Sequence, residues 1–125
     1  MREWIAVACG GMLGALLRYS MAKVLQPAIA TWHFPLNTIF VNSIGCFAIG
    51  FLGGYSEHIQ SLSPNLRAFL WVGFLGSFTT FSAFGYETHN LMRSGHLFVA
   101  LLNIALQLIL CLFAVGFGYY CAKHL

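Results

Sequence analysis

Gly73-Phe74-Leu75-Gly76-Ser77-Phe78-Thr79-Thr80-Phe81-Ser82-Ala83-Phe84-Gly85-Tyr86-Glu87 is the most unusual segment of this chain. It is apolar enough to cross a membrane, yet it holds four Ser or Thr hydroxyls, three glycines, four phenylalanines and a carboxylate. Glycine and hydroxyl side chains weaken a continuous helix, and irregular backbone at membrane depth is tolerated only where protein or water covers it. Two structures fit the segment: a helix broken near residues 76–80, or an unbroken helix whose hydroxyls bond to carbonyls one turn earlier. The residues by themselves favour the unbroken helix.

The composition of the whole chain indicates a membrane protein. Of its 125 residues, 59% are hydrophobic and 7% are charged, whereas soluble domains carry about 25% charged residues. A spanning helix needs about 20 mostly apolar residues, and four such windows fit: residues 4–25, 36–55, 68–90 and 97–120. We therefore predict an all-α membrane protein with four transmembrane helices in one domain. Too little chain remains for a soluble catalytic domain, so no enzyme is expected; the connectors are residues 26–34, 56–66 and 92–96.

The remaining chemistry-bearing residues exclude several classes of function. The five histidines show no metal-ligand spacing, so no transition-metal or haem site is expected. A net charge of +3 is too small and too scattered for nucleic-acid binding. The four cysteines have no paired spacing, and we interpret them as small apolar fillers of the spans: Cys9, Cys46, Cys111 and Cys121.

The basic residues of the connectors give almost no orientation signal. With four spans, both termini and the second connector share one side, which carries Arg2, Arg67 and Lys123. The other side carries Lys23 and Arg93, and also Arg18 if that side chain extends toward it. An excess of Lys and Arg normally fixes the orientation, so the balance allows two explanations. The chain inserts both ways round and pairs antiparallel with itself, or it has one orientation with a weak bias.

The first two spans carry features of a closely packed bundle. The pairs Gly10/Gly14 and Gly50/Gly54 have the small-x-x-x-small spacing that lets membrane helices approach closely. Arg18 lies well inside the first span, where a guanidinium costs about 2.5–3.5 kcal/mol. Its head group either extends to the membrane interface or lies at the mouth of a water-filled cavity that attracts anions.

Polar side chains on two spans predict a polar interior. Thr38, Asn42 and Gly45 share one face of the second span, and Asn103 and Gln107 share one face of the fourth. Inward amides glue helices together or present N–H donors to an anion. Proton- or cation-coupled transporters need an acidic residue at membrane depth, and none lies at the depth of these amides. A small anion is therefore the favoured solute.

Two aromatic rings follow the Gly/Thr-rich part of the third span. Phe81 and Phe84 flank Ser82 at a spacing of three residues. Core packing explains most phenylalanines in membrane helices. The alternative is that a ring edge, which carries partial positive charge, contacts a dehydrated anion.

These motifs, in this order, resemble the Fluc (CrcB) family of small bacterial fluoride channels. The resemblance covers almost the whole chain, through GGMLGALLRY in the first span, NTIFVNSIGCFAIG in the second, the segment quoted above, and ALLN near the start of the fourth. Asn37 departs from the family, which usually has Gly there, and Gln107 lies at a position that varies.

The resemblance implies an antiparallel, dual-topology homodimer in the bacterial inner membrane, with a broken third helix and two fluoride pathways. It implies that Asn42 donates to fluoride and that the ring edges of Phe81 and Phe84 contact the ion. The hydroxyls of Thr80 and Ser82 match positions that contribute to the polar pathway.

The resemblance matches four other residues to family positions and implies a role for three of them. Gly76 and Thr79 match positions whose backbone carbonyls, contributed by both subunits, hold a structural Na⁺ ion. Arg18 matches a basic residue near the aqueous entrance. Glu87 matches a carboxylate to which we assign no role.

The function implied by the resemblance is passive, fluoride-selective export that lowers the toxicity of fluoride in the cell. The alternative is a small multidrug exporter of four spans, which needs a membrane-embedded Glu in the first span. This chain has Arg18 there and only Glu3 at the edge. A structural anchor subunit of a larger complex is a further alternative.

Overall fold

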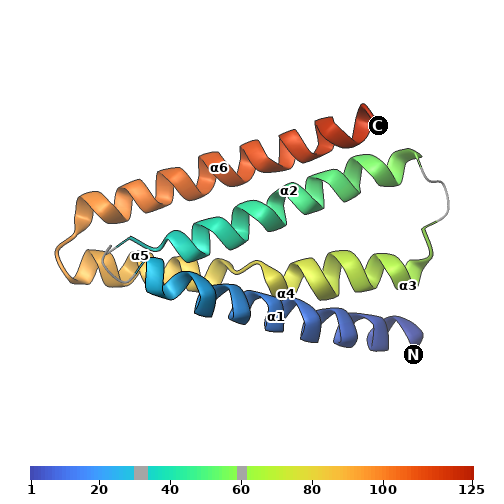
Figure 1. Ribbon diagram of the computed structural model, residues 1–125, viewed down its shortest axis with the longest axis horizontal. Helices are drawn as coiled ribbons and strands as arrows, with labels where there is room; N and C mark the ends of the chain where they lie inside the picture. The colour runs from blue at the N-terminus through green and yellow to red at the C-terminus, as the bar shows by residue number, and fades with distance from the viewer. Residues whose placement is uncertain (30–33, 59–61) are drawn as a thin grey trace.

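The structure, a computed structural model, describes residues 1–29, 34–58 and 62–125, and the regular elements of these residues are all helices (Figure 1). They are α1 (Arg2–Ile29), α2 (Leu36–His58), α3 (Pro64–Arg67), η1 (Ala68–Leu75), α4 (Gly76–Phe78), α5 (Phe81–Arg93) and α6 (Leu97–Lys123). Four segments are long and apolar enough to cross a membrane: Arg2–Gln26, Leu36–Glu57, Pro64–Arg93 and Leu97–Lys123. The predicted four-helix architecture is therefore confirmed. Parts of the first two predicted connectors, residues 30–33 and 59–61, lie outside the described residues.

The four spans form two closely packed pairs. Helix α1 packs along the third span, and α2 packs along α6, while contacts between the two pairs are sparser. Both chain termini lie at the same end of the bundle (Figure 1). This arrangement places α2 beside the middle of the third span.

Glycines set the close approach within each pair. A Cβ on Gly10 or Gly14 would collide with the backbone of the third span, at Phe69 and Phe74 respectively. A Cβ on Gly50 would collide with the backbone of α6. The predicted role of these small residues is confirmed, because a glycine lets two membrane helices approach to backbone contact.

The third span is assembled from several short pieces. It begins with a cap in which Ser63 Oγ accepts from the Leu66 N–H at 3.3 Å, followed by a proline in the first turn. A π-helical stretch, η1, follows before the regular turn of α4. After α5 the chain reverses at Gly95, whose φ of 82° lies in the left-handed region that glycine favours. The short turn returns the chain as α6.

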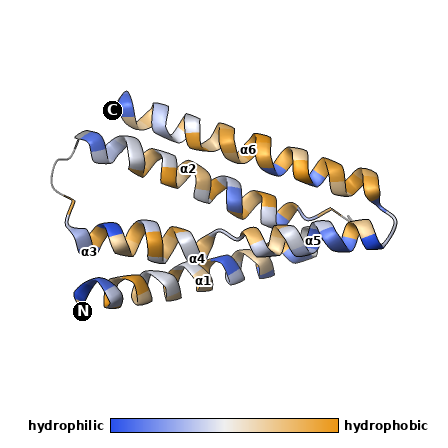
Figure 2. Ribbon diagram, turned by 180° about the vertical axis from the view of Figure 1, so that it is seen from behind, coloured by the Kyte–Doolittle hydropathy of each residue, from blue (hydrophilic) through white to orange (hydrophobic). Residues whose placement is uncertain are grey.

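Polar residues are distributed unevenly over the spans. Figure 2 shows α6 as largely hydrophobic, whereas α5 carries many hydrophilic residues.

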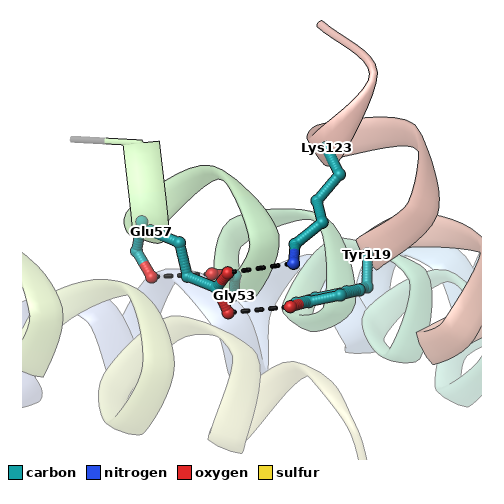
Figure 3. Close-up of polar contacts among 5 residues, drawn as sticks. Gly53, Glu57, Tyr119 and Lys123 are labelled. Carbon is teal, nitrogen blue, oxygen red and sulfur yellow. Dashed lines mark hydrogen bonds and ion pairs between the residues drawn. The ribbon is translucent and has the colours of Figure 1, made fainter.

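At the end of the bundle that holds the termini, Tyr119 Oη donates to Glu57 Oε1 at 2.8 Å, and Lys123 Nζ lies 3.4 Å from Glu57 Oε2 (Figure 3). The ammonium of Lys123 also lies 4.9 Å from the centre of the Tyr119 ring. This polar cluster joins the C-terminal ends of α2 and α6.

We expect Gly118→Ala in α6 to destabilise the protein, because a Cβ there meets the backbone of Phe47 in α2. Overpacking of this kind costs about 1–3 kcal/mol. Gly116→Ala is the matched control, since a Cβ at Gly116 meets nothing within 4 Å and alanine favours a helix by about 0.5–1 kcal/mol. The measurement is the thermal unfolding midpoint in detergent. Equal midpoints for the two variants would contradict the close α2–α6 contact.

Candidate functional site

The third span is broken at two consecutive residues. Thr79 has φ −79° and ψ 159°, and Thr80 has φ −151° and ψ 116°, so both are extended. Helix α4 ends before them, and α5 begins after them with Thr80 as its cap, whose Oγ1 accepts from the Ala83 N–H at 3.2 Å. Of the two structures that the sequence allowed, the broken helix is the one observed (Figure 1).

The side chain of Asn42 holds the broken backbone from the neighbouring helix α2. Its Nδ2 donates to the Thr80 carbonyl oxygen at 3.1 Å, and the Thr80 N–H donates to its Oδ1 at 2.8 Å. The side chain is only 7% exposed. One turn further along α2, a Cβ on Gly45 would collide with the Thr79 side chain. The absence of a side chain at Gly45 therefore lets the break approach Asn42.

The break releases carbonyl oxygens of α4 and of the break itself from their helical donors, among them those of Gly76 and Thr79. In a continuous helix the Thr80 N–H would donate to Gly76 and the Ala83 N–H would donate to Thr79. Here the first donates to Asn42 and the second to the Thr80 hydroxyl. The carbonyls of Gly76 and Thr79 are the two that the resemblance connects with sodium, and a backbone oxygen without its helical donor is a suitable ligand for a hard cation.

The break opens onto a cavity of about 310 Å³ between the two helix pairs, which we call the central pocket. Its walls come from α2, the third span and α6. They consist of Asn42, Gly45, Cys46, Ile49, Trp71, Leu75, Gly76, Thr79, Thr80, Phe81, Phe84, Gln107, Leu108 and Cys111. Among these described lining residues none is charged. Six of the predicted site residues therefore line one cavity: Asn42, Gly76, Thr79, Thr80, Phe81 and Phe84.

The two predicted rings lie at the start of α5 with very different exposure. Phe84 is 8% exposed and Phe81 is 80% exposed, and their centroids are 5.4 Å apart at an interplanar angle of 55°. The tilt turns the edge of one ring toward the face of the other. Ser82 lies between them on the chain, with its Oγ 3.2 Å from the Thr80 Oγ1, although it does not itself line the central pocket.

Helix α6 contributes a side-chain amide, that of Gln107, whose position varies in the family. Gln107 is 5% exposed, and neither its Nε2 nor its Oε1 has a hydrogen-bond partner. Burial of an amide without partners costs free energy, so this side chain is a candidate for contact with a solute in the central pocket. Asn103, one turn earlier, instead donates to Thr88 Oγ1 at 2.9 Å. The four-residue spacing of the two amides was the signal in the sequence.

Arg18 lies apart from the central pocket. It lines a second cavity of about 330 Å³, the Arg18 pocket, together with Thr38 and Glu87. Thr38 Oγ1 donates to Glu87 Oε1 at 2.6 Å, whereas Glu87 Oε2 is buried without a partner. Thr80 lines both cavities, so the break is the boundary between a charged and an uncharged compartment.

Comparison with known proteins assigns the chain to a family. A model of the family described as "CrcB-like protein, Camphor Resistance (CrcB)" matches residues 5–119. The chain belongs to the CrcB family.

A CrcB relative from Elusimicrobium minutum is 42% identical over 98% of this chain and 95% of its own length. A relative from Campylobacter jejuni is 40% identical over 95% of this chain and 96% of its own. One from Citrifermentans bemidjiense is 35% identical over the whole of both chains. All three carry the name "Fluoride-specific ion channel FluC". The family resemblance expected from the sequence is thus confirmed.

We expect Asn42→Ala to destabilise this CrcB protein, because it leaves the Thr80 N–H and C=O without their partner. Orphaned polar groups of this kind cost about 1–3 kcal/mol. Ser43→Ala is the matched control, because Ser43 Oγ is buried without a hydrogen-bond partner and its removal should be neutral or slightly stabilising. Thermal unfolding in detergent measures both variants. A loss for Ser43→Ala as large as that for Asn42→Ala would contradict the role of Asn42 at the break.

Proposed function

We propose that this chain forms a fluoride-selective ion channel that exports fluoride passively from the cytoplasm and so lowers its toxicity. The names of relatives that match nearly the whole length of the chain support the proposal, because they describe an ion channel and not an enzyme. The single structural observation that carries it is the central pocket, whose described walls offer amides, hydroxyls and phenyl rings but no charged side chain.

Neutral dipoles suit the transport of a small, strongly hydrated anion. A selective pore must replace the hydration shell of the ion with well-placed donors, yet bind weakly enough to let the ion leave. The Asn42 Nδ2 has two hydrogens, and one of them is used by the Thr80 carbonyl. The other serves fluoride, followed along the pathway by the edges of Phe81 and Phe84 and by the hydroxyls of Thr80 and Ser82. Arg18, in its separate pocket, attracts anions to the entrance without binding them inside the narrow part.

Gln107 joins this pathway as a second amide donor. It faces the central pocket from α6, opposite the third span, and its Nε2 has no partner. A solute that accepts hydrogen bonds would satisfy this nitrogen and remove the cost of its burial. The pathway therefore has donors from α2 and α6 on one side and rings from α5 on the other.

A second copy of the chain completes the site. Phe81 is 80% exposed, so one chain alone leaves the ring without a covering wall. Because the Thr80 and Ala83 N–H groups donate elsewhere, the carbonyls of Gly76 and Thr79 are left to bind a structural Na⁺ ion. A hard cation, however, takes about six oxygen ligands or more. Two chains related by a two-fold axis would supply both sets of carbonyls at one point. One chain supplies two of these oxygens, and the pair of chains supplies four.

The copies are arranged antiparallel in the bacterial inner membrane, each chain inserting in either orientation. The near balance of basic residues between the two sides supports this arrangement, because it removes the usual orientation signal. An antiparallel pair gives two equivalent fluoride pathways, one through each chain's central pocket.

The small multidrug exporter is the weaker alternative. Coupled export requires a membrane carboxylate that exchanges protons with the solute. The carboxylate of Glu87 lies in the Arg18 pocket, held by Thr38, and does not line the central pocket. The names of the matching relatives also support the channel and not the exporter.

Fluoride efflux from liposomes that contain only the purified polypeptide tests the function. We expect a fluoride-selective electrode to record rapid passive efflux without ATP or a proton gradient, and chloride efflux to be far slower. Efflux of chloride at the same rate, or fluoride efflux that requires a proton gradient, would contradict a fluoride channel. Activity of the polypeptide alone would also exclude a purely structural anchor role.

The variants Phe81→Ile and Phe74→Ile separate the pathway from packing in the same assay. A ring-edge contact of about 1 kcal/mol corresponds to roughly a fivefold change in rate, so Phe81→Ile should slow fluoride efflux by about that factor. Phe74 stacks on Phe78 at 6.2 Å and does not line the central pocket, so its substitution should alter flux much less. Equal slowing by the two variants would return Phe81 to a packing role.

A cleavable tag at the C-terminus tests dual topology. If both orientations are present in one membrane, an impermeant protease should remove the tag from about half of the chains in sealed vesicles, because the charge balance gives no preferred side. After detergent is added, the protease should remove the tag from all chains. Cleavage of nearly all or nearly none of the tags in sealed vesicles would contradict insertion in both orientations.

A further inference from the structure

Two of the four cysteines meet on the wall of the central pocket. Cys46 on α2 and Cys111 on α6 both line this pocket. Each lies one turn before the point where Gly50 of α2 and the backbone of Val115 in α6 come into close contact. Both are partly exposed free thiols. Their separation of 65 positions in the chain hides the pair in the sequence, where each cysteine looks like an apolar filler.

The surroundings of the pair limit what it can bind. The described residues contain no group of three or more His, Cys, Asp or Glu side chains that could hold a metal ion. Tetrahedral Zn²⁺ needs four ligands, so this pair alone is a poor zinc site. Two sulfur ligands suit soft metal ions, which prefer thiolates and accept low coordination numbers. The same pocket is lined by the apolar Ile49 and Leu108 and by the amide of Gln107, and a soft ion prefers thiolate sulfur to an amide oxygen.

We infer that Cys46 and Cys111 form a two-thiolate binding site for a soft, two-coordinate metal cation such as Hg(II), Ag(I) or Cu(I). With mercuric chloride as the probe, each thiol loses its proton and forms one S–Hg bond. The two chlorides leave with the two protons, so no electrons are transferred. The thiolate is the metal-binding form of cysteine, and release of protons on binding is the general rule for such sites.

Occupation of this site would obstruct the central pocket. Gln107 precedes Cys111 by one turn of α6, and Gly45 and Cys46 follow Asn42 by one turn of α2. A metal ion between the two sulfurs therefore lies beside the two amides of the pathway. This consequence rests on the proposed fluoride channel, whereas the binding of metal by the two thiols does not.

The binding test uses the full chain in detergent with Cys9→Ser and Cys121→Ser, which leaves only the pair. After mercuric chloride is added, denaturing mass spectrometry should show single chains that carry one mercury and have lost two protons, with no free thiol remaining. Variants that also carry Cys46→Ala or Cys111→Ala hold mercury through one sulfur only. Removal of the bridged mercury should require at least about tenfold more competing monothiol than removal of mercury from these variants, because the second sulfur acts within the same molecule. Two mercury ions on one chain, mercury that links two chains, or equal retention by the single-thiol variants would overturn the site.

The flux test uses the same double-serine background in liposomes, in which both proposed ligands are intact. Mercuric chloride should stop fluoride efflux, and an added dithiol should restore it. Should one of the alanine variants fail to fold, the mass measurement on the background protein still decides the binding claim. If mercury bridges the two thiols but fluoride efflux continues, the thiol site is upheld and the central pocket is not part of the fluoride pathway. Absence of fluoride efflux before mercury is added would refute the channel while the mass measurement still judges the site.

Discussion

Backbone groups that leave a helix inside a bilayer must find partners within the protein, and in this chain the partner is one asparagine. Each unsatisfied peptide group in lipid costs several kcal/mol, so a break at Thr79 and Thr80 requires a donor and an acceptor at the same place. The Asn42 side chain supplies both to the Thr80 peptide. Because Gly45 has no side chain, α2 comes close enough for these bonds to form. The position of α2 against the third span follows from this contact.

The packing of α6 on α2 makes the position of α6 depend on the same contact. Glycines at the α2–α6 contact allow backbone approach, so α6 is held at a fixed rotation beside α2. That rotation turns Gln107 and Cys111 toward the central pocket. The walls of the cavity therefore depend indirectly on the two hydrogen bonds that hold the break, because these bonds place the α2–α6 pair relative to the third span.

The break also separates fixed charge from neutral dipoles. Arg18 and Glu87 lie in one cavity, the amides and rings lie in the other, and Thr80 borders both. A full positive charge beside a narrow anion route would bind the ion tightly and slow its exit, whereas partial charges allow both entry and exit. The separation gives a physical reason why a membrane segment concentrates hydroxyls, glycines and phenyl rings: they form an irregular, weakly polar wall that a regular apolar helix does not provide.

The sequence by itself determined the class of protein, the four spans and the family, because hydrophobic length and the Gly/Thr/Phe-rich segment are local properties of the chain. It also identified the close-packing glycines and the inward amides, since helical spacing alone places residues on a common face. It did not decide whether the third span is broken, because hydroxyls that bond back to their own helix and hydroxyls that replace helical bonds have the same local pattern. Only the tertiary structure resolved this, through the Asn42–Thr80 contact between residues 38 positions apart. The meeting of Cys46 with Cys111 and the partnerless state of Gln107 likewise depend on how two helices are rotated against each other, and that rotation is set by packing between segments rather than by any single one.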